Sequence, residues 1–271
     1  MHDFFSFIIL GLIQGMAEFL PVSSSGHLIL ARVFFGFTAN NGLAIDAVLQ
    51  LATVLAVIVY FRKDLFDLTV TLFRRIFGKS VSADEERLMV ALIIGTVPAV
   101  IVGYLLEDIM ATVFRNSHLV AYALVVGSAI MFFAEYASHR LKSFFDVSHV
   151  GVGKAFLIGL FQTLALIPGM SRSGMTISGG LFLGLSRESA ARFGFLLAVP
   201  IILGSGLKKL LELGVNGTLS AVGPELLVGS AVAFVSGLAA IHALLLFVRT
   251  QPLYAFIAYR LALAILIFAF L

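Results

Sequence analysis

The sequence predicts an all-α polytopic membrane protein, with about six transmembrane helices and two re-entrant helical hairpins arranged as an inverted-topology repeat. Of its 271 residues, 60% are hydrophobic and only 12% are charged, whereas a soluble domain carries about 25% charged residues. Uncharged runs at 88–106, 116–134 and 226–248 are long enough to cross a bilayer, which takes about 20 apolar residues. The chain is therefore predicted to be one integral membrane domain in contact with membrane lipids.

The basic isoelectric point, near 9.3, does not indicate a nucleic-acid partner. The basic residues cluster in segments between the apolar runs, as positive-inside topology produces. The segments 62–87 and 137–154 are rich in Lys and Arg, whereas the connection 107–117 has only Arg115. We expect 62–87 and 137–154 on the cytoplasmic side, with 62–87 as a solvated loop. The chain has no cysteine, so disulfide and thiol chemistry are excluded.

Ten helices are expected, and they differ in length. Six are long enough to span a membrane: 43–61, 88–106, 118–136, 192–211, 225–248 and 253–270. Four are short and form two pairs, each broken by Pro, Ser and Gly: 4–20 with 25–36, and 155–167 with 174–185. Broken backbone in a bilayer is tolerated only where protein or water buries it, so each pair is predicted to be a re-entrant hairpin.

Weak internal similarity indicates a duplication. Short matches recur in the same order in both halves: Gly11–Gln14 with Gly159–Gln162, Leu55–Val57 with Leu197–Val199, Gly95/Ala99/Gly103 with Gly229/Ala233/Gly237, and Tyr122–Ala123 with Tyr254–Ala255. The repeats would cover about 1–145 and 151–271 of a single domain. Because each contains an odd number of full spans, the second would be inverted, which places a site between them near the bilayer midplane.

The small-residue pattern Gly95, Ala99 and Gly103 indicates closely packed helices. It leaves open whether that packing lies within one chain or in a homodimer.

The first broken pair carries the motif Q-G-M-A-E-F-L-P-V-S-S-S-G-H at 14–27. Gln14 and Glu18 are four residues apart and share a helical face. Pro21 ends that helix, and Ser23 to Ser25 stand at the start of the next one. His27 follows Ser24 by less than one helical turn.

The second broken pair repeats this pattern from Pro168 to Thr176, now with Arg172. Helix N-termini present unpaired N–H groups and a partial positive charge, which favour anions. The guanidinium of Arg172 adds a bidentate donor suited to phosphate. Two such helix starts facing each other predict a diphosphate site. Glu18 is compatible with an anion if a divalent metal, Mg²⁺ or Ca²⁺, bridges carboxylate and phosphate, and the expected metal ligands are Glu18 and Gln14.

Structural roles are the alternative. An intramembrane Glu can simply pair with an arginine, and hydroxyl side chains often join helices. Arg32, Arg187 and Arg192 are expected to snorkel or pair near helix ends, and His242 to be a packed polar residue. Four further polar residues have open roles: Asp46 and Gln50 as cavity-lining residues, and Glu135 and Arg260 as partners of other buried groups.

With these motifs the chain resembles the undecaprenyl-pyrophosphate phosphatase family, the bacitracin-resistance proteins of bacterial membranes. The family pattern (E/Q)-x-x-x-E followed by P-V-S-S-(S/T)-G-H stands here at Gln14 to His27, and P-G-x-S-R-S-x-x-T at Pro168 to Thr176. The resemblance implies hydrolysis of undecaprenyl pyrophosphate to the monophosphate carrier of cell-wall synthesis, in the bacterial plasma membrane. It also implies a divalent metal and an active site open to the periplasmic side.

The mechanistic hypothesis assigns Ser24 as nucleophile, His27 as the group that takes or relays its proton, and Glu18 as base or metal ligand. The residues expected to bind phosphate are Arg172, Ser171, Ser173, Thr176, Ser23 and Gly174. Direct attack by water, with Ser24 only a ligand, is the competing route. A polyprenyl-phosphate flippase or transporter is the alternative function, because inverted repeats with broken helices are also transporter architecture.

Overall fold

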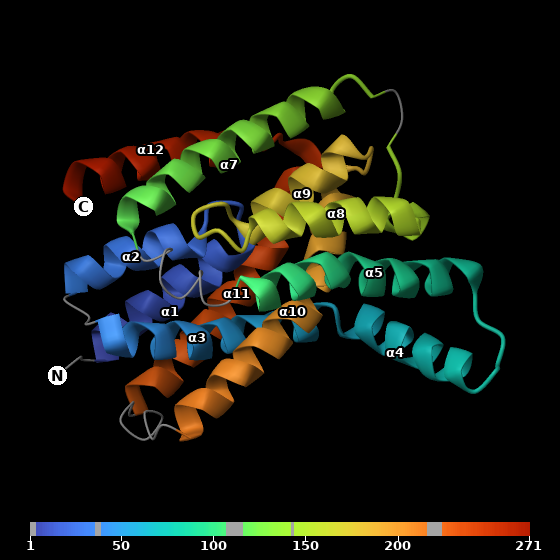
Figure 1. The fold of residues 1–271 in the computed structure, drawn as a ribbon, viewed down its shortest axis with the longest axis horizontal. Helices are drawn as coiled ribbons and strands as arrows, with labels where there is room; N and C mark the ends of the chain where they lie inside the picture. Colours follow the sequence, from blue (N-terminus) through green and yellow to red (C-terminus); the bar gives the residue numbers. More distant parts are fainter. Residues whose placement is uncertain (1–3, 36–38, 107–115, 142–143, 216–223) are drawn as a thin grey trace.

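The computed structural model, shown in Figure 1, describes residues 4–35, 39–106, 116–141, 144–215 and 224–271. In these ranges the backbone forms α-helices, one 3-10 helix (η2, Val147–His149) and no strand beyond an isolated bridge between Phe145 and Leu185. The predicted all-α class is confirmed. Arg115 lies outside the described residues.

Four short helices stand where the broken pairs were expected. The first pair is α1 (Phe4–Phe19) and α2 (Ser24–Phe35), and the second is α8 (Val152–Leu164) and α9 (Arg172–Phe182). The chain leaves helical geometry between them at 20–23 and 165–171. In Figure 1 both breaks lie in the interior, between the longer helices.

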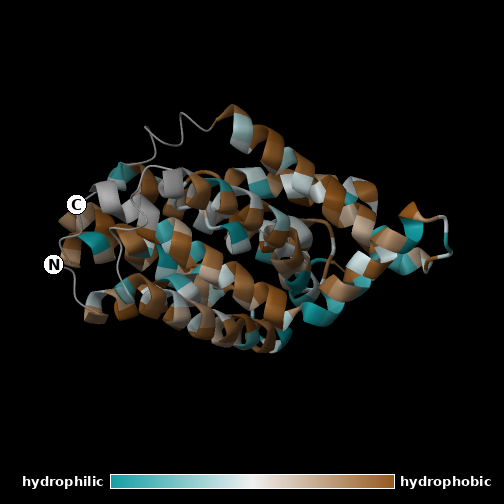
Figure 2. Ribbon diagram, turned by 90° about the horizontal axis from the view of Figure 1, so that it is seen from below, coloured by the Kyte–Doolittle hydropathy of each residue, from teal (hydrophilic) through white to brown (hydrophobic). Residues whose placement is uncertain are grey.

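The longer helices identify a polytopic membrane protein. Among the described residues, four helices are long and apolar enough to cross a membrane: α5 (Ala83–Leu105), α7 (Ser117–Ser138), α10 (Arg187–Val215) and α11 (Pro224–Thr250). A fifth span results if α3 (Ala39–Tyr60) is counted with α4 (Arg62–Ile76), from which it is bent by 80°. The expected span at 253–270 is α12 (Tyr254–Phe270), whose 17 residues fall among the shorter apolar helices. In Figure 2 the colour of hydrophobic residues predominates on most of the helical backbone.

The prediction of a loop at 62–87 was wrong, because most of this segment is helical. Leu65, Leu68 and Leu72 in α4 recur at helical spacing, and Leu65 packs against the protein core. The charged residues at both ends of the segment concealed this period. Phe66 and Phe73 are exposed, which is typical of an amphipathic helix lying at a bilayer surface.

Glycines allow two helix pairs to approach until their backbones touch. A Cβ atom at Gly11 of α1 would lie 2.1 Å from the carbonyl oxygen of Gly229 in α11. One at Gly159 of α8 would lie 2.3 Å from the carbonyl oxygen of Gly95 in α5. The close packing expected at Gly95 therefore occurs within one chain. The sequence matches relate Gly11 to Gly159 and Gly229 to Gly95, so each contact is the counterpart of the other under the proposed duplication.

Ion pairs fix several helix ends. Arg32 pairs with Asp46 and Arg192 with Asp64, as expected for arginines near helix ends. The fully buried carboxylate of Glu135 accepts from Arg187 and, over 3.2 Å, from the backbone N–H of Leu253. His242 also has a partner, since its Nδ1 lies 2.9 Å from the hydroxyl of Tyr60.

We predict that Gly11→Ala lowers the melting temperature of the detergent-purified protein by several degrees. The added methyl would force α1 and α11 apart, and overpacking of this kind costs about 1–3 kcal/mol. The matched control is Gly153→Ala in α8, where a Cβ atom would meet nothing within 4 Å. Equal melting temperatures for the two variants would show that the glycine contact is not needed.

Candidate functional site

Each break contains one serine whose backbone has a positive φ angle, in the left-handed region. Ser23 has φ = 73° and Ser171 has φ = 71°, and such backbone costs on the order of 1 kcal/mol for a residue other than glycine. The Ser171 hydroxyl caps α9 by accepting the Gly174 N–H over 3.2 Å. The Ser23 hydroxyl lies 3.0 Å from that of Ser25, and the Ser171 hydroxyl lies 3.2 Å from that of Ser173. The two breaks therefore share one local geometry.

The two breaks also bind each other. The Gly169 N–H donates to the Ser25 hydroxyl over 3.0 Å, and the Ser173 hydroxyl donates to the Leu20 carbonyl over 3.0 Å. Arg260 of α12 donates from Nη2 to the Gly169 carbonyl over 3.0 Å. As a result, the starts of α2 and α9 are held close together in the protein interior.

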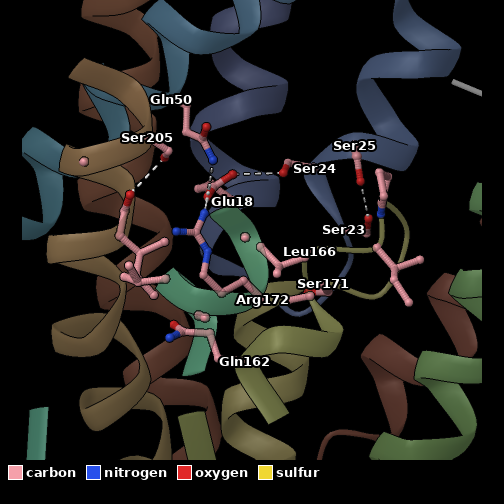
Figure 3. Close-up of a pocket in the computed structure, with 18 of the residues that line it drawn as sticks. Glu18, Ser23, Ser24, Ser25, Gln50, Gln162, Leu166, Ser171, Arg172 and Ser205 are labelled. Atoms are coloured by element: carbon pink, nitrogen blue, oxygen red, sulfur yellow. Dashed lines mark hydrogen bonds and ion pairs between the residues drawn. The ribbon is translucent and has the colours of Figure 1, made fainter. Parts of the chain in front are cut away.

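Glu18, near the end of α1, is the centre of the polar contacts. Its Oε2 accepts from Gln14 Nε2 and from the Ser24 hydroxyl, each over 2.9 Å. Its Oε1 accepts from Arg172 and, over 3.5 Å, from Gln50 Nε2. Figure 3 shows Ser24, Gln50 and Arg172 converging on this carboxylate. An ion pair with an arginine was the structural alternative for an intramembrane glutamate. Glu18 does pair with Arg172, but both side chains line a cavity.

That cavity has a volume of about 580 Å³. Its walls come from both breaks and from the C-terminal halves of α5 and α10, and its polar lining includes Glu18, Ser23, Ser24, Ser25, Gln50, Tyr104, Gln162, Ser171, Arg172, Ser205 and Lys208. The charged side chains of this lining are those of Glu18, Arg172 and Lys208. A pocket of this size that contains a guanidinium and several hydroxyl groups suits a small anionic group.

The structure brings together Glu18, Ser23, Ser24, Ser171 and Arg172 of the predicted site residues. Gln14 is buried outside the cavity lining and supports Glu18. Three residues predicted to bind phosphate are also absent from the lining: Ser173, Gly174 and Thr176. The hydroxyl of Thr176 donates to the carbonyl oxygens of Arg172 and Ser173 in its own helix, so it is used locally.

The ring nitrogens of His27, the predicted proton relay, are hydrogen-bonded to groups other than Ser24. Its Nδ1 lies 2.7 Å from the Ser23 carbonyl oxygen, and its Nε2 lies 2.7 Å from the hydroxyl of Tyr259 in α12. Both ring nitrogens are thus engaged, and Ser24 donates to Glu18 instead. Sequence spacing placed His27 within a turn of Ser24 but could not indicate Tyr259, a partner that is distant in sequence.

The sequence suggested Gln50 and Asp46 as cavity-lining residues. Gln50 does line the cavity, whereas Asp46 pairs with Arg32. Further cavity residues were not predicted. Ser205 and Lys208 come from the apolar span α10 and had no signal of their own. Gln162 did carry one, because it matches Gln14 in the internal repeat.

The residues around Glu18 fit a metal ion only together with substrate oxygens. Within the described ranges no group of three or more His, Cys, Asp or Glu side chains could hold a metal ion. Mg²⁺ is often bound through one or two carboxylates plus substrate phosphates. Glu18 meets that requirement, with the Ser24 hydroxyl as a neighbouring oxygen.

Comparison with known proteins identifies the family of this chain. A family model described as "Bacitracin resistance protein BacA" matches residues 7–266. The chain belongs to the BacA family.

Curated relatives extend the similarity over nearly all of the chain. It is 44% identical to a protein from Mycobacterium sp. (strain KMS), over 96% of this chain and 94% of that one. It is 44% identical to one from Mycolicibacterium smegmatis, over 97% and 95%, and 41% identical to one from Thermobifida fusca, over 97% and 88%. All three are named undecaprenyl-diphosphatase.

We predict that Arg260→Lys destabilises the protein by on the order of 2 kcal/mol. Arg260 is fully buried and donates to the Ser128 hydroxyl and to the Leu124 and Gly169 carbonyls. A lysine keeps the charge but lacks the planar fork that reaches all three acceptors. The measurement is the melting temperature in detergent. The control, Arg249→Lys at an exposed pair with Glu188, should change little, and an equal loss in both variants would contradict this account.

Proposed function

We propose that this protein is a membrane phosphatase that hydrolyses undecaprenyl pyrophosphate, or a similar polyprenyl diphosphate, to the lipid monophosphate and inorganic phosphate. The observation that carries the proposal is the Ser24 hydroxyl donating to Glu18, with Arg172 on the same carboxylate, at the wall of one cavity. The names of the relatives support this substrate class. A phosphatase of this kind in the bacterial plasma membrane would return the lipid carrier to cell-wall synthesis.

In the proposed reaction the Ser24 oxygen attacks the distal phosphorus as its proton passes to Glu18. The bond from that phosphorus to the bridging oxygen breaks, and the polyprenyl monophosphate leaves. Water then cleaves the phosphoserine, releasing inorganic phosphate and restoring the serine. Arg172 would bind the equatorial oxygens of the transferred group, since phosphoryl transfer depends mainly on positioning and charge stabilisation. His27, bound to the Ser23 carbonyl and Tyr259, would position the break.

Direct attack by water is the competing route. Glu18 would then activate the water, and Ser24 would only bind the substrate. Both routes use the same carboxylate and the same guanidinium, so they differ only in whether a phosphoserine forms.

A divalent metal belongs to the proposal as a ligand shared between protein and substrate. Glu18 would hold the ion with the substrate's phosphate oxygens, and the ion would neutralise part of their charge. Gln14 was expected to be a second metal ligand. In the structure its amide nitrogen donates to Glu18, and the ligand role remains a prediction.

The proposed site opens toward the periplasm. The basic segments 62–87 and 137–154 are joined by a 3.3 Å hydrogen bond from Arg87 to the Ser148 carbonyl, so they lie at one side, which the positive-inside rule makes cytoplasmic. The cavity is lined by Ala99, Val100, Gly103 and Tyr104, which lie toward the opposite end of α5 from Arg87. This placement supports an opening on the outer side.

The relatives' names support hydrolysis and not the transporter alternative, since all three describe an enzyme acting on a diphosphate.

The direct test is metal-dependent phosphate release from undecaprenyl pyrophosphate by the purified protein in detergent. We expect Glu18→Gln and Ser24→Ala to lower kcat by about a thousandfold, because each removes a reacting group. Ser205→Ala is the matched control, since this cavity serine donates to the Ile201 carbonyl of its own helix. Trapping a phosphorylated Ser24 would support the covalent route, and a Ser24→Ala protein with near-parental turnover would eliminate it. A parent protein without phosphate release would contradict the proposed function.

An apolar groove beside the cavity indicates where the lipid tail would lie. It has a volume of about 420 Å³ and is formed by Leu65, Leu92, Ile93, Thr96, Val97, Val100, Ile101, Leu196, Val199 and Pro200. Val100 and Pro200 also line the polar cavity, so the groove and the cavity lie next to each other. A lipid whose diphosphate occupies the cavity could extend its first isoprene units along α5 and α10.

We predict that Val97→Trp raises the KM for undecaprenyl pyrophosphate roughly three- to tenfold by filling the groove, with little change for a water-soluble short-chain diphosphate. Val125→Trp is the matched control, because both valines are 40% exposed but Val125 of α7 lies outside the groove. Equal effects on long and short substrates would argue against this path for the tail.

A further inference from the structure

Gln162 of α8 has a polar side chain that nothing in the described protein satisfies. Only 2% of the residue is exposed, and neither Nε2 nor Oε1 has a hydrogen-bond partner. Leaving a buried polar group unpaired costs about 1–3 kcal/mol, and most such groups in folded proteins do find partners. Gln162 lines the same cavity as Glu18 and Arg172 and lies on the Arg172 side of it in Figure 3.

The first hairpin shows what this amide lacks. One constant offset along the chain relates Gln14 to Gln162, Glu18 to Leu166 and Ser23 to Ser171. Gln14 donates to Glu18, one turn further along its helix. The residue one turn after Gln162 is Leu166, whose side chain has no hydrogen-bond acceptor. Gln162 therefore lacks the carboxylate that its counterpart Gln14 binds in the first hairpin.

The surroundings of Gln162 indicate the chemistry of its missing partner. The cavity lining includes the guanidinium of Arg172, a group that binds phosphate oxygens well. An amide N–H₂ group supplies two donors, and phosphate oxygens are strong acceptors. A diphosphate would accept hydrogen bonds from the amide donors of Gln162, and it would place negative charge beside the guanidinium of Arg172.

We propose that Gln162 is a ligand of the substrate diphosphate, donating from Nε2 to a non-bridging phosphate oxygen. This inference rests on the proposed function for the identity of the substrate. The two hairpins then contribute different groups to the reaction, since the first carries Glu18 and the nucleophile Ser24, and the second carries the phosphate ligands Arg172 and Gln162. Gln14 and Gln162 differ in role although they match in sequence.

The test is calorimetric titration of the detergent-purified protein with inorganic pyrophosphate in the presence of Mg²⁺, alongside phosphate-release kinetics. Gln162→Met keeps the length and volume of the side chain but removes both polar atoms. We expect it to melt at or above the parental temperature, because it removes unpaired buried groups, and to weaken pyrophosphate binding about tenfold. The KM for the lipid substrate should rise by a similar factor.

Two further variants complete the test. Gln162→Glu keeps a polar side chain of the same shape but adds a negative charge, so pyrophosphate binding should weaken further. Thr163→Val is the control on the same helix, because the Thr163 hydroxyl donates to the Leu160 carbonyl and Thr163 is not among the cavity residues. Its pyrophosphate Kd should stay within about twofold of the parental value.

The inference is overturned if the parent protein does not bind pyrophosphate, or if Gln162→Met binds it as tightly as the parent. If Gln162→Met fails to fold, an unchanged Kd in Gln162→Glu overturns it equally. Pyrophosphate binding that depends on Gln162 in a parent protein without phosphate release would refute the proposed enzyme and leave the ligand assignment standing.

Discussion

The ion pair between Glu18 and Arg172 is the interaction on which the interior depends. It joins the end of α1 to the start of α9, two short helices from opposite halves of the chain. Charges buried in a membrane protein are expensive unless they are paired and hydrogen-bonded. Glu18 meets this condition through Gln14, Ser24 and Gln50. The contacts from Ser24, Gln50 and Arg172 also fix residues of the cavity wall, so the stability of the interior and the geometry of the site have the same origin.

The sequence predicted the class of fold and most residues of the site, but it predicted the contacts between those residues less well. Pro21 and Pro168 marked the breaks, and the motifs brought Glu18, Ser24 and Arg172 into one cavity, because local rules on proline, caps and helix ends decide those features. The helix α4 was missed because flanking charges concealed its apolar period. The partner of His27 could not be predicted, since Tyr259 reaches it only through tertiary packing. Thr176 matched a motif, but its local hydrogen bonds turn it toward its own helix.

The two hairpins illustrate how a duplicated framework can diverge. Their serine turns, caps and glutamines agree in position and in backbone conformation. Glu18 corresponds to Leu166, and Ser24 corresponds to Arg172. Under the proposed duplication, opposite charges therefore arose at different places in the two halves, and the halves became complementary. A symmetric site would have placed like charges together, at a cost in repulsion and desolvation.

The glycine contacts have a consequence for the order in which the chain is made. Gly11 meets Gly229, and Gly159 meets Gly95, so a short helix of each half packs against a long helix of the other. During synthesis, α1 emerges first, but its partner α11 follows only after most of the chain has been inserted. The first hairpin is therefore inserted before its packing partner α11 is present, and the cavity is complete only at the end of assembly. Neither half contains the packing partners that it needs to reach this arrangement alone.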